Sequence, residues 1–474
     1  MVFSSLFFLF FFLPCAIIAN FLFVKWVKVQ NFVLMLFSLL FYYWGEKNYI
    51  VVMLSCIFIN YISGILIGLS KNQMLKKLYL LMAIVISVGL LVYFKYFNFV
   101  MDNVNYFLDS KVDMGVTNII LPLGISFYTF HALSYVIDVY WGKVQYEKNI
   151  FTFICYVSLF PQLVAGPIVR YRDIRHSFYH RIITRAGFKN GILRFCFGMG
   201  KKILIANTVA IVADKAFALP HADLTFATAW LGAIAYTLQI YFDFSGYSDM
   251  AIGIGLMLGF KYKENFNFPY RALSIQDFWR RWHISLSSWF RDYVYIPLGG
   301  NRKSEARTYF NLILVFALCG LWHGASYTFL AWGLFHGLFL VLERTKFGQF
   351  IHSLPNFMRH VYVLVAVSFG WVLFRAENFS DAAAFFKAMV IPVNFDIQDL
   401  GGELNILALF AFAIGIILSL GLNSYIKDYL ITSKNKWLIQ TYQYSSMFTA
   451  MGVLLVTLLP LSSNSYSPFL YFRF

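Results

Sequence analysis

The sequence has little charge. Of its 474 residues only 13% are Asp, Glu, Lys or Arg, against roughly a quarter in a typical soluble domain, whereas 60% are hydrophobic and 20% are aromatic. No polar stretch between the apolar runs is long enough to form a soluble domain. The net charge of +16 therefore indicates basic connections between membrane spans. It argues against nucleic-acid binding, which would need a folded basic face outside the membrane.

Several sequence signatures are also missing. The cysteines lie in apolar stretches without CxxC spacing, which argues against a disulfide framework and against a structural zinc site; they are Cys15, Cys56, Cys155, Cys196 and Cys319. No HExxH, GxSxG, Walker or GxGxxG motif supports a protease, a hydrolase or a nucleotidase. No internal repeat or low-complexity tract is present, so we expect one membrane domain over residues 1–474.

Long apolar runs dominate the chain and predict an all-α polytopic membrane protein with about eleven to twelve crossings. Residues 2–24 follow no basic n-region and precede no cleavage motif, so they are interpreted as a retained first span rather than a signal peptide. The expected spans are residues 2–24, 32–44, 50–69, 78–94, 119–140, 191–217, 226–260, 312–324, 326–342, 361–374, 406–422 and 448–461.

The distribution of lysines predicts the orientation. Basic residues such as Lys25, Lys71 and Lys143 follow the first, third and fifth spans, so these loops should be cytoplasmic and the N-terminus should lie outside. The apolar run at residues 151–168 is interrupted at Pro161 and leads into an arginine-rich stretch. A re-entrant hairpin from the cytoplasmic side fits this run better than a full crossing.

His323 is the most informative single residue, because it lies in a segment, residues 314–325, that is apolar enough for a bilayer. An ionisable ring there predicts a functional site, although a hydrogen bond across helices is the alternative. An imidazole can remove the proton of a hydroxyl that attacks an acyl carbonyl. Cys319, one helical turn earlier, could carry an acyl thioester, but a small residue that eases helix packing is favoured.

The other histidines differ in setting. His283 lies in a basic and aromatic connection, residues 261–307, that should be cytoplasmic. His131 and His336 are interpreted as structural.

Residues 241–250 place an unusual number of polar side chains within an apolar run. They predict either a polar wall of a substrate cavity or a structurally paired patch, with arginines near Arg280 and Arg281 as the expected partners of the two aspartates. The polar members are Tyr241, Asp243, Ser245, Tyr247, Ser248 and Asp249.

Residues 276–300 mix tryptophans and tyrosines with arginines. This composition is typical of a segment at the membrane interface. It would equally suit a binding surface for an anionic, nucleotide-containing donor such as a coenzyme A ester, because arginine binds phosphate groups and aromatic rings stack on bases. Composition leaves these two interpretations open.

Five blocks of the sequence resemble the membrane-bound O-acyltransferases, in the order found in that family. They are residues 121–127 (LPLGISF), 160–168 (FPQLVAGPI), 241–249 (YFDFSGYSD), 277–289 (DFWRRWHISLSSW) and 320–324 (GLWHG), so the specific match covers roughly residues 120–345. The chain is similar to the bacterial branch that comprises alginate and peptidoglycan O-acetyltransferases and D-alanyl transfer proteins.

The resemblance implies a ring of about eleven to twelve transmembrane helices, with re-entrant helices, around a central funnel or tunnel. It implies that His323 is the catalytic histidine and that His283 is the second signature residue, which is histidine or asparagine in different members. No bound cofactor or metal is expected. The candidate binding and cavity residues are Asp243, Ser245, Tyr247, Asp249, Arg280, Arg281, Trp282 and Trp322.

The expected function is O-acetyl transfer from cytosolic acetyl-coenzyme A, across a bacterial cytoplasmic membrane, to an extracytoplasmic glycan. An extracytoplasmic partner, an SGNH-type or related O-acetyltransferase, would attach the group, and the sequence does not identify the glycan. One alternative is D-alanyl or other acyl transfer from a carrier protein. A transporter would be expected to show inverted repeats, and none is evident. A metal or haem protein would use His283 and His323 as ligands.

Overall fold

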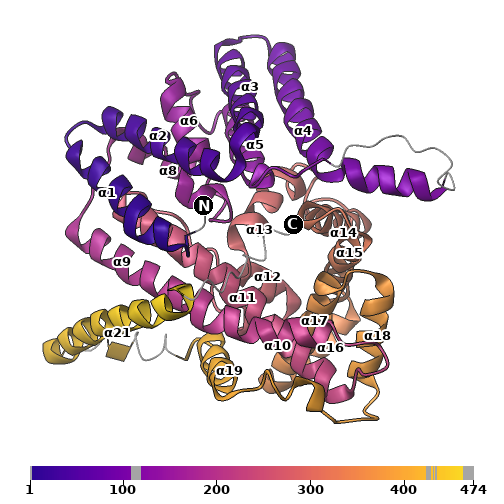
Figure 1. Cartoon of the computed structure of the whole chain (residues 1–474). Helices are drawn as coiled ribbons and strands as arrows, with labels where there is room; N and C mark the ends of the chain where they lie inside the picture. The colour runs from indigo at the N-terminus through magenta and orange to yellow at the C-terminus, as the bar shows by residue number, and fades with distance from the viewer. Residues whose placement is uncertain (1–2, 108–118, 423–428, 431, 433–434, 463–474) are drawn as a thin grey trace. The chain divides into compact units, whose positions relative to one another are not determined.

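The computed structural model describes residues 3–107, 119–422, 429–430, 432 and 435–462, and within these residues the chain is helical without any β-strand. Figure 1 shows the helices in chain order. The α-helices are α1 (Leu13–Leu22), α2 (Val27–Glu46), α3 (Ile50–Leu69), α4 (Gln73–Phe107), α5 (Ile125–Tyr140), α6 (Ile150–Ser158), α7 (Phe160–Leu163), α8 (Tyr171–Tyr179), α9 (Arg185–Gly200), α10 (Asn207–Phe217), α11 (Phe226–Met257), α12 (Ile275–Arg281), α13 (Ile284–Phe290), α14 (Glu305–His323), α15 (Tyr327–Leu342), α16 (Lys346–Ser353), α17 (Asn356–Arg375), α18 (Phe379–Val390), α19 (Ile406–Ser419) and α21 (Lys436–Ser462).

Short helices of other types join several of these elements. Of those in the described parts of the chain, three are π-helical, namely η1 (Phe8–Phe12), η3 (Lys201–Ala206) and η5 (Arg291–Tyr295). Three are 3₁₀ turns, namely η2 (Lys47–Tyr49), η4 (Pro269–Arg271) and η6 (Gln398–Leu400). The segment η3 matters most for the site, because it continues α9 and carries two consecutive lysines, Lys201 and Lys202.

The helices confirm a polytopic membrane protein. Within the described residues, 5 helical stretches are long and apolar enough to cross a membrane: Val27–Leu69, Gln73–Tyr106, Arg185–Phe217, Asn356–Arg375 and Trp437–Ser462. Shorter apolar helices lie at Phe8–Leu22, Tyr327–Leu342 and Ile406–Ser419. The count of eleven to twelve crossings and the ring around a funnel stay predictions.

Most helix bounds agree with the expected spans. The span expected at residues 50–69 coincides with α3, whereas α5 begins later than the expected residue 119. The delay has a local cause: Gly124, the N-cap of α5, adopts a left-handed conformation with φ of 73°, which glycine accepts without steric cost. The expected interruption near Pro161 is present as a break at Leu159 between α6 and α7.

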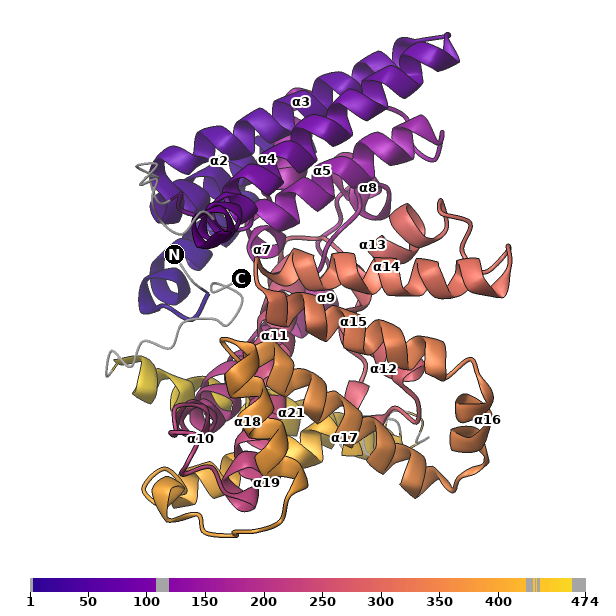
Figure 2. The ribbon, with the colours of Figure 1, turned by 90° about the vertical axis from the view of Figure 1, so that its right-hand side faces the viewer.

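The chain folds into two compact units, and the boundary between them falls within α9 and α11. The first unit comprises Met1–Ile192 and Ala251–Lys263, and the second comprises Leu193–Met250 and Glu264–Phe474. In the first unit α3 packs against α4 and α5, and Figure 2 shows these three helices side by side. The single membrane domain expected from the sequence stays a prediction.

The second unit contains all the candidate site residues, and its α14 and α15 form a tightly packed helical hairpin beside α17. Two glycines permit this packing. A Cβ atom on Gly320 would lie 2.3 Å from the carbonyl oxygen of Phe329, and one on Gly333 would lie 2.2 Å from that of Phe316. Glycine at these positions therefore lets the two backbones touch, as is common where membrane helices pack.

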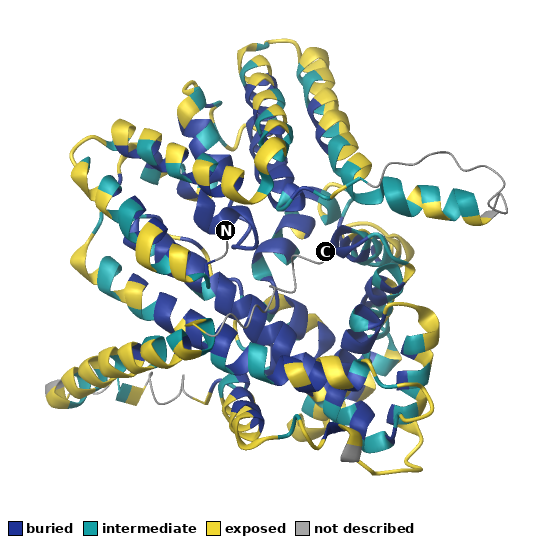
Figure 3. Cartoon of the chain, in the orientation of Figure 1, coloured by how far each residue is buried: buried dark blue, intermediate teal, exposed yellow. Residues whose placement is uncertain are grey.

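The second unit has a buried interior and, on α21, an exposed apolar surface of the kind that faces lipid. Figure 3 shows α21 as largely exposed, and only 11% of the residues in its most apolar stretch are buried. Its exposed side chains include Phe448, Met451 and Leu455. An apolar helix with this exposure is expected for a membrane span in contact with lipid.

Candidate active site

His323 lies at the junction of α14 and α15, where the local sequence ends one helix and begins the next. Gly324 caps α14 in an extended conformation, and the hydroxyl of Ser326 then accepts the Thr328 N–H at 3.2 Å to start α15. His323 is consequently the last residue of α14, held at a fixed point of the hairpin.

Aromatic rings surround the His323 imidazole, which is only 3% exposed. The ring centroid lies 4.8 Å from that of Trp322, 5.1 Å from that of Trp332 on α15 and 5.1 Å from that of Phe374 on α17. Three helices thus contribute to one pocket, which we call the aromatic pocket and define by Trp322, His323, Trp332 and Phe374. In this setting the imidazole meets little bulk water.

His283 lies between two short helices. The hydroxyl of Ser274 caps α12 by accepting the Asp277 N–H at 3.0 Å, and α12 ends at Arg281. His283 is then the N-cap of α13, with φ of 42° and ψ of 54°. A residue other than glycine rarely adopts this left-handed conformation, and such residues cluster at functional sites.

The His283 ring is also buried, and polar groups hold it. Its Nδ1 lies 3.2 Å from the Oδ1 of Asn265 and 3.5 Å from the hydroxyl of Ser285. The ring of Phe244 packs edge-on against it at 4.6 Å between centroids. Burial lowers the pKa of His283 to about 3, so its imidazole is neutral at physiological pH.

Trp322 brings the two histidines into one site. Its indole ring lies 6.0 Å from the His283 ring and 4.8 Å from the His323 ring, measured between centroids. The two histidines, which the sequence places in different segments, thus pack against the same indole ring although they are far apart along the chain, and their roles stay predictions. Trp282 lies in the adjoining aromatic cluster, where its ring is 4.8 Å from that of Trp371.

The predicted polar residues of 241–250 lie on α11, and their aspartates are neutralised by lysines and an arginine. Asp243 forms an ion pair with Lys202 of η3, and both side chains are almost completely buried, at 2% and 4% exposure. A buried charge requires such a partner, because an unpaired one would be strongly destabilising.

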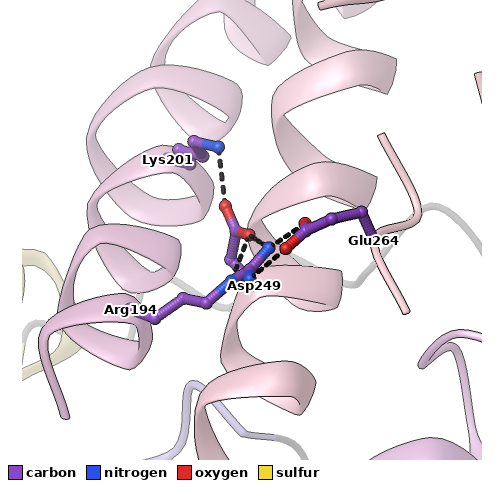
Figure 4. A network of polar contacts seen from close by, with 4 residues as sticks. All are labelled: Arg194, Lys201, Asp249 and Glu264. Carbon is purple, nitrogen blue, oxygen red and sulfur yellow. Dashed lines mark hydrogen bonds and ion pairs between the residues drawn. The ribbon is translucent and has the colours of Figure 1, made fainter. Parts of the chain in front are cut away.

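Asp249 belongs to a larger ionic network, shown in Figure 4. Its carboxylate accepts hydrogen bonds from Lys201 at 2.6 Å and from Arg194 of α9 at 2.7 Å. Arg194 also binds Glu264 through both terminal nitrogens, one of them at 2.6 Å. We call these four residues the Arg194 network.

The predicted partners of the two aspartates, Arg280 and Arg281, are not the ones found in the structure. Arg281 pairs with Asp277 one helical turn earlier, at 2.9 Å, and Arg280 is exposed. The cations that neutralise Asp243 and Asp249 come instead from α9 and η3. Two consecutive lysines in a π-helical segment serve two different aspartates, a pairing that sequence spacing did not indicate.

The remaining members of the predicted cavity wall are buried. Ser245, Tyr247 and Ser248 are 3%, 4% and 2% exposed. Within the described part of the chain, the hydroxyls of Ser245 and Ser248 have no hydrogen-bond partner. A polar cavity wall formed by these residues stays a prediction, and the residue of this motif that contacts His283 is Phe244.

Two other sequence candidates, His336 and Cys319, are also buried. His336 of α15 is fully buried, 5.1 Å from Trp279 and 5.3 Å from Trp332 between ring centroids. Cys319 is buried and makes no disulfide, like the other cysteines. Among the described residues no group of three or more His, Cys, Asp or Glu side chains is arranged to hold a metal ion.

The site as a whole consists of two buried histidines and the aromatic rings around them in a helical membrane protein, an arrangement suited to an enzyme that transfers a proton away from bulk water. Comparison with known proteins agrees with this class. Residues 38–380 match MBOAT, the membrane-bound O-acyltransferase family. The chain belongs to this family and is an O-acyltransferase.

The similar proteins include members of three groups. The chain is 40% identical to a probable alginate O-acetylase of Azotobacter vinelandii, over 100% of both chains. It is 36% identical to a peptidoglycan O-acetyltransferase of Helicobacter pylori, over 82% of this chain and 80% of the relative. It is 28% identical to a teichoic acid D-alanyltransferase of Bacillus subtilis, over 56% of this chain and 69% of the relative.

Proposed function

We propose that this protein is an O-acetyltransferase that takes an acetyl group from cytosolic acetyl-coenzyme A and delivers it across the cytoplasmic membrane for O-acetylation of an extracytoplasmic glycan. The observation that carries the proposal is that two buried histidines both pack against the ring of Trp322. Relatives whose names specify acetyl transfer match most or all of the chain and support the acetyl group.

In the proposed reaction His323 acts on the hydroxyl that receives the acetyl group. Its imidazole takes the hydroxyl proton while the oxygen attacks the thioester carbonyl, so a C–O bond forms as the C–S bond breaks. The sulfur leaves with the electron pair and, once protonated, gives free coenzyme A. Transient acylation of His323 is the other form of this step. His283 orients the donor or the acceptor.

The tunnel implied by the family suits this chemistry for an energetic reason. Moving a phosphorylated carrier into hydrocarbon would cost several kcal/mol or more, whereas an acetyl group alone carries no charge. The carrier can therefore stay in the cytosol. The proposed cavity wall consists of the α11 residues Asp243, Ser245, Tyr247 and Asp249, with Arg280, Arg281, Trp282 and Trp322 nearer the donor.

We further propose a bacterial cytoplasmic membrane location with the N-terminus outside, and an extracytoplasmic partner of the SGNH type that attaches the acetyl group. The second candidate function is D-alanyl transfer from a carrier protein. It is favoured only by the D-alanyltransferase relatives, which match 56% and 48% of this chain.

The test is acyl transfer by the purified protein in lipid vesicles, with radiolabelled acetyl-coenzyme A and a glycan acceptor with its partner protein. Wild type should release coenzyme A, and His323→Ala should not. His336→Gln is the matched control, because it alters another buried imidazole on the same hairpin. Transfer from a D-alanyl carrier protein but not from acetyl-coenzyme A would replace the proposed donor.

A further inference from the structure

Asn265 binds three consecutive residues of the segment that carries His283. Its backbone carbonyl accepts the N–H of Ile284 at 2.9 Å, and its side-chain Oδ1 accepts the N–H of Ser285 at 3.1 Å. The same Oδ1 lies 3.2 Å from the Nδ1 of His283. Asn265 is itself buried. These bonds hold the strained left-handed turn at His283 in place.

The contacts of Asn265 also determine which nitrogen of His283 carries the proton. A backbone N–H can only donate, so the Asn265 side-chain atom that faces Ser285 must be the carbonyl oxygen rather than the amide nitrogen. That oxygen can only accept, so the Nδ1 of His283 must donate to it. A neutral imidazole has one donor and one acceptor nitrogen, and Nε2 therefore carries the lone pair.

The Arg194 network anchors the segment that holds Asn265. Glu264, the preceding residue, is bound by both terminal nitrogens of Arg194, and Arg194 is bound in turn to Asp249 of α11. On the other side of Asn265, the N–H of Asn267 donates to the carbonyl of Arg281 at 3.0 Å. The Asn265 side chain is thus fixed from both directions along the chain.

We propose that Asn265 is a positioning residue that holds His283 in the Nδ1-protonated tautomer, so that Nε2 presents its lone pair to accept a hydrogen bond from the group that His283 orients. The role in catalysis rests on the proposed acyl transfer, whereas the tautomer itself does not. Asn265 touches neither donor nor acceptor in this proposal, and its effect on the reaction passes through His283.

The test uses the full-length protein in lipid nanodiscs with ¹⁵N-labelled histidine. Solid-state NMR distinguishes protonated from unprotonated ring nitrogens, and the His283 signals are assigned from their loss in His283→Gln. Wild type should show a protonated Nδ1 and an unprotonated Nε2 for this residue. Asn265→Leu removes the acceptor at similar size, and it should shift His283 to the other tautomer or to a mixture.

Transfer kinetics on the same samples give the functional readout. Asn265→Leu should lower kcat by ~10²-fold, the scale of a misplaced catalytic group, and leave the KM for acetyl-coenzyme A nearly unchanged. Asn265→Asp keeps an acceptor oxygen and should retain both the tautomer and most of kcat. Asn267→Ala, which alters an exposed side chain of the same segment, is the matched control. Asn265→Ala replaces the leucine variant if that variant does not fold.

Two results would overturn the proposal: an unchanged His283 tautomer in Asn265→Leu and Asn265→Ala, or equal loss of kcat in the leucine and aspartate variants. Failure of the proposed function looks different. Wild type would then transfer no acetyl group from acetyl-coenzyme A, while the NMR comparison would still decide whether Asn265 sets the tautomer.

Discussion

The aromatic pocket and the ion pairs of α11 both bury polar side chains, but the groups that surround these side chains differ. In the pocket, His323 is packed among Trp322, Trp332 and Phe374. Along α11, Asp243 and Asp249 are each bound by lysine or arginine from the neighbouring helix. Both regions lie in the same unit of the chain.

The difference separates two reasons for a polar residue at membrane depth. The aspartates are explained by their partners, because paired charges join α11 to α9 and η3. His323 is an ionisable ring in an aromatic setting, and an ionisable residue at membrane depth points to a chemical role. Substitutions in the pocket should therefore reduce the rate of transfer, and substitutions in the ion pairs should reduce stability.

The largest expected effect follows from His323→Ala. Acetyl transfer should fall to background, because the proposed base is lost, while the size-exclusion profile stays that of a folded protein. Radiolabel transfer from acetyl-coenzyme A in vesicles measures the first quantity. Activity retained by a folded His323→Ala protein would assign the chemistry to another residue.

At His283 we expect a smaller loss that depends on the replacement. His283→Ala should lower kcat by ~10²-fold, the lower range for a lost acid or base group. It should also lose ~1 kcal/mol of stability, because alanine tolerates positive φ poorly. His283→Asn should be more stable than His283→Ala, since asparagine accepts the left-handed backbone. Equal stability of the two variants would show that the turn carries no strain.

Much of the fold followed from the sequence, because apolar runs of about twenty residues have one favourable solution in a bilayer. The expected span at 50–69 matched α3. His323, His283 and Trp322 were all candidate site residues, and the structure brings their rings together, while their roles stay predictions. Partner choice was not predictable. A buried aspartate indicates that a cation lies nearby, but the sequence does not show which helix supplies that cation.

Asn265 was missed for a related reason. A single asparagine in a polar connection carries no spacing signal, and its role depends on a turn that places residues 283–285 beside it. The left-handed backbone at His283 was equally invisible in the sequence, because no glycine or turn motif marks that position. Only the folded chain shows that the two features belong together.

Breaking the buried ion pair between Lys202 and Asp243 tests whether the ion pairs of α11 stabilise the fold. Lys202→Met leaves Asp243 charged and buried, at an expected cost of ~3–5 kcal/mol in unfolding free energy. Lys201→Met is the matched control. Its partner Asp249 keeps Arg194, and Lys201 itself is 27% exposed, so the cost should be about 1 kcal/mol or less. Thermal unfolding in one detergent compares the two variants, and equal losses would contradict this account.

The smallest expected effect concerns pH. The folded pKa of His283, about 3, lies below its ordinary value of 6.5, so the unfolded chain binds more protons between these values. His283 therefore favours folding fully above pH 6.5, and this contribution is lost as the pH falls toward 3. Wild type should lose more Tm between about pH 7.5 and about pH 5 than His283→Asn does. Parallel curves would mean that His283 titrates normally in the folded protein.

The glycine contacts of the α14–α15 hairpin constrain how the pocket can open. Because the backbones touch at Gly320 and Gly333, sliding one helix along the other would drive carbonyl oxygens into neighbouring atoms. His323 and Trp332, on the two helices of the hairpin, must then move together as one rigid body. If an acyl group passes His323 as proposed, its passage would require a hinge motion of the hairpin away from Phe374 of α17, rather than shear within the hairpin.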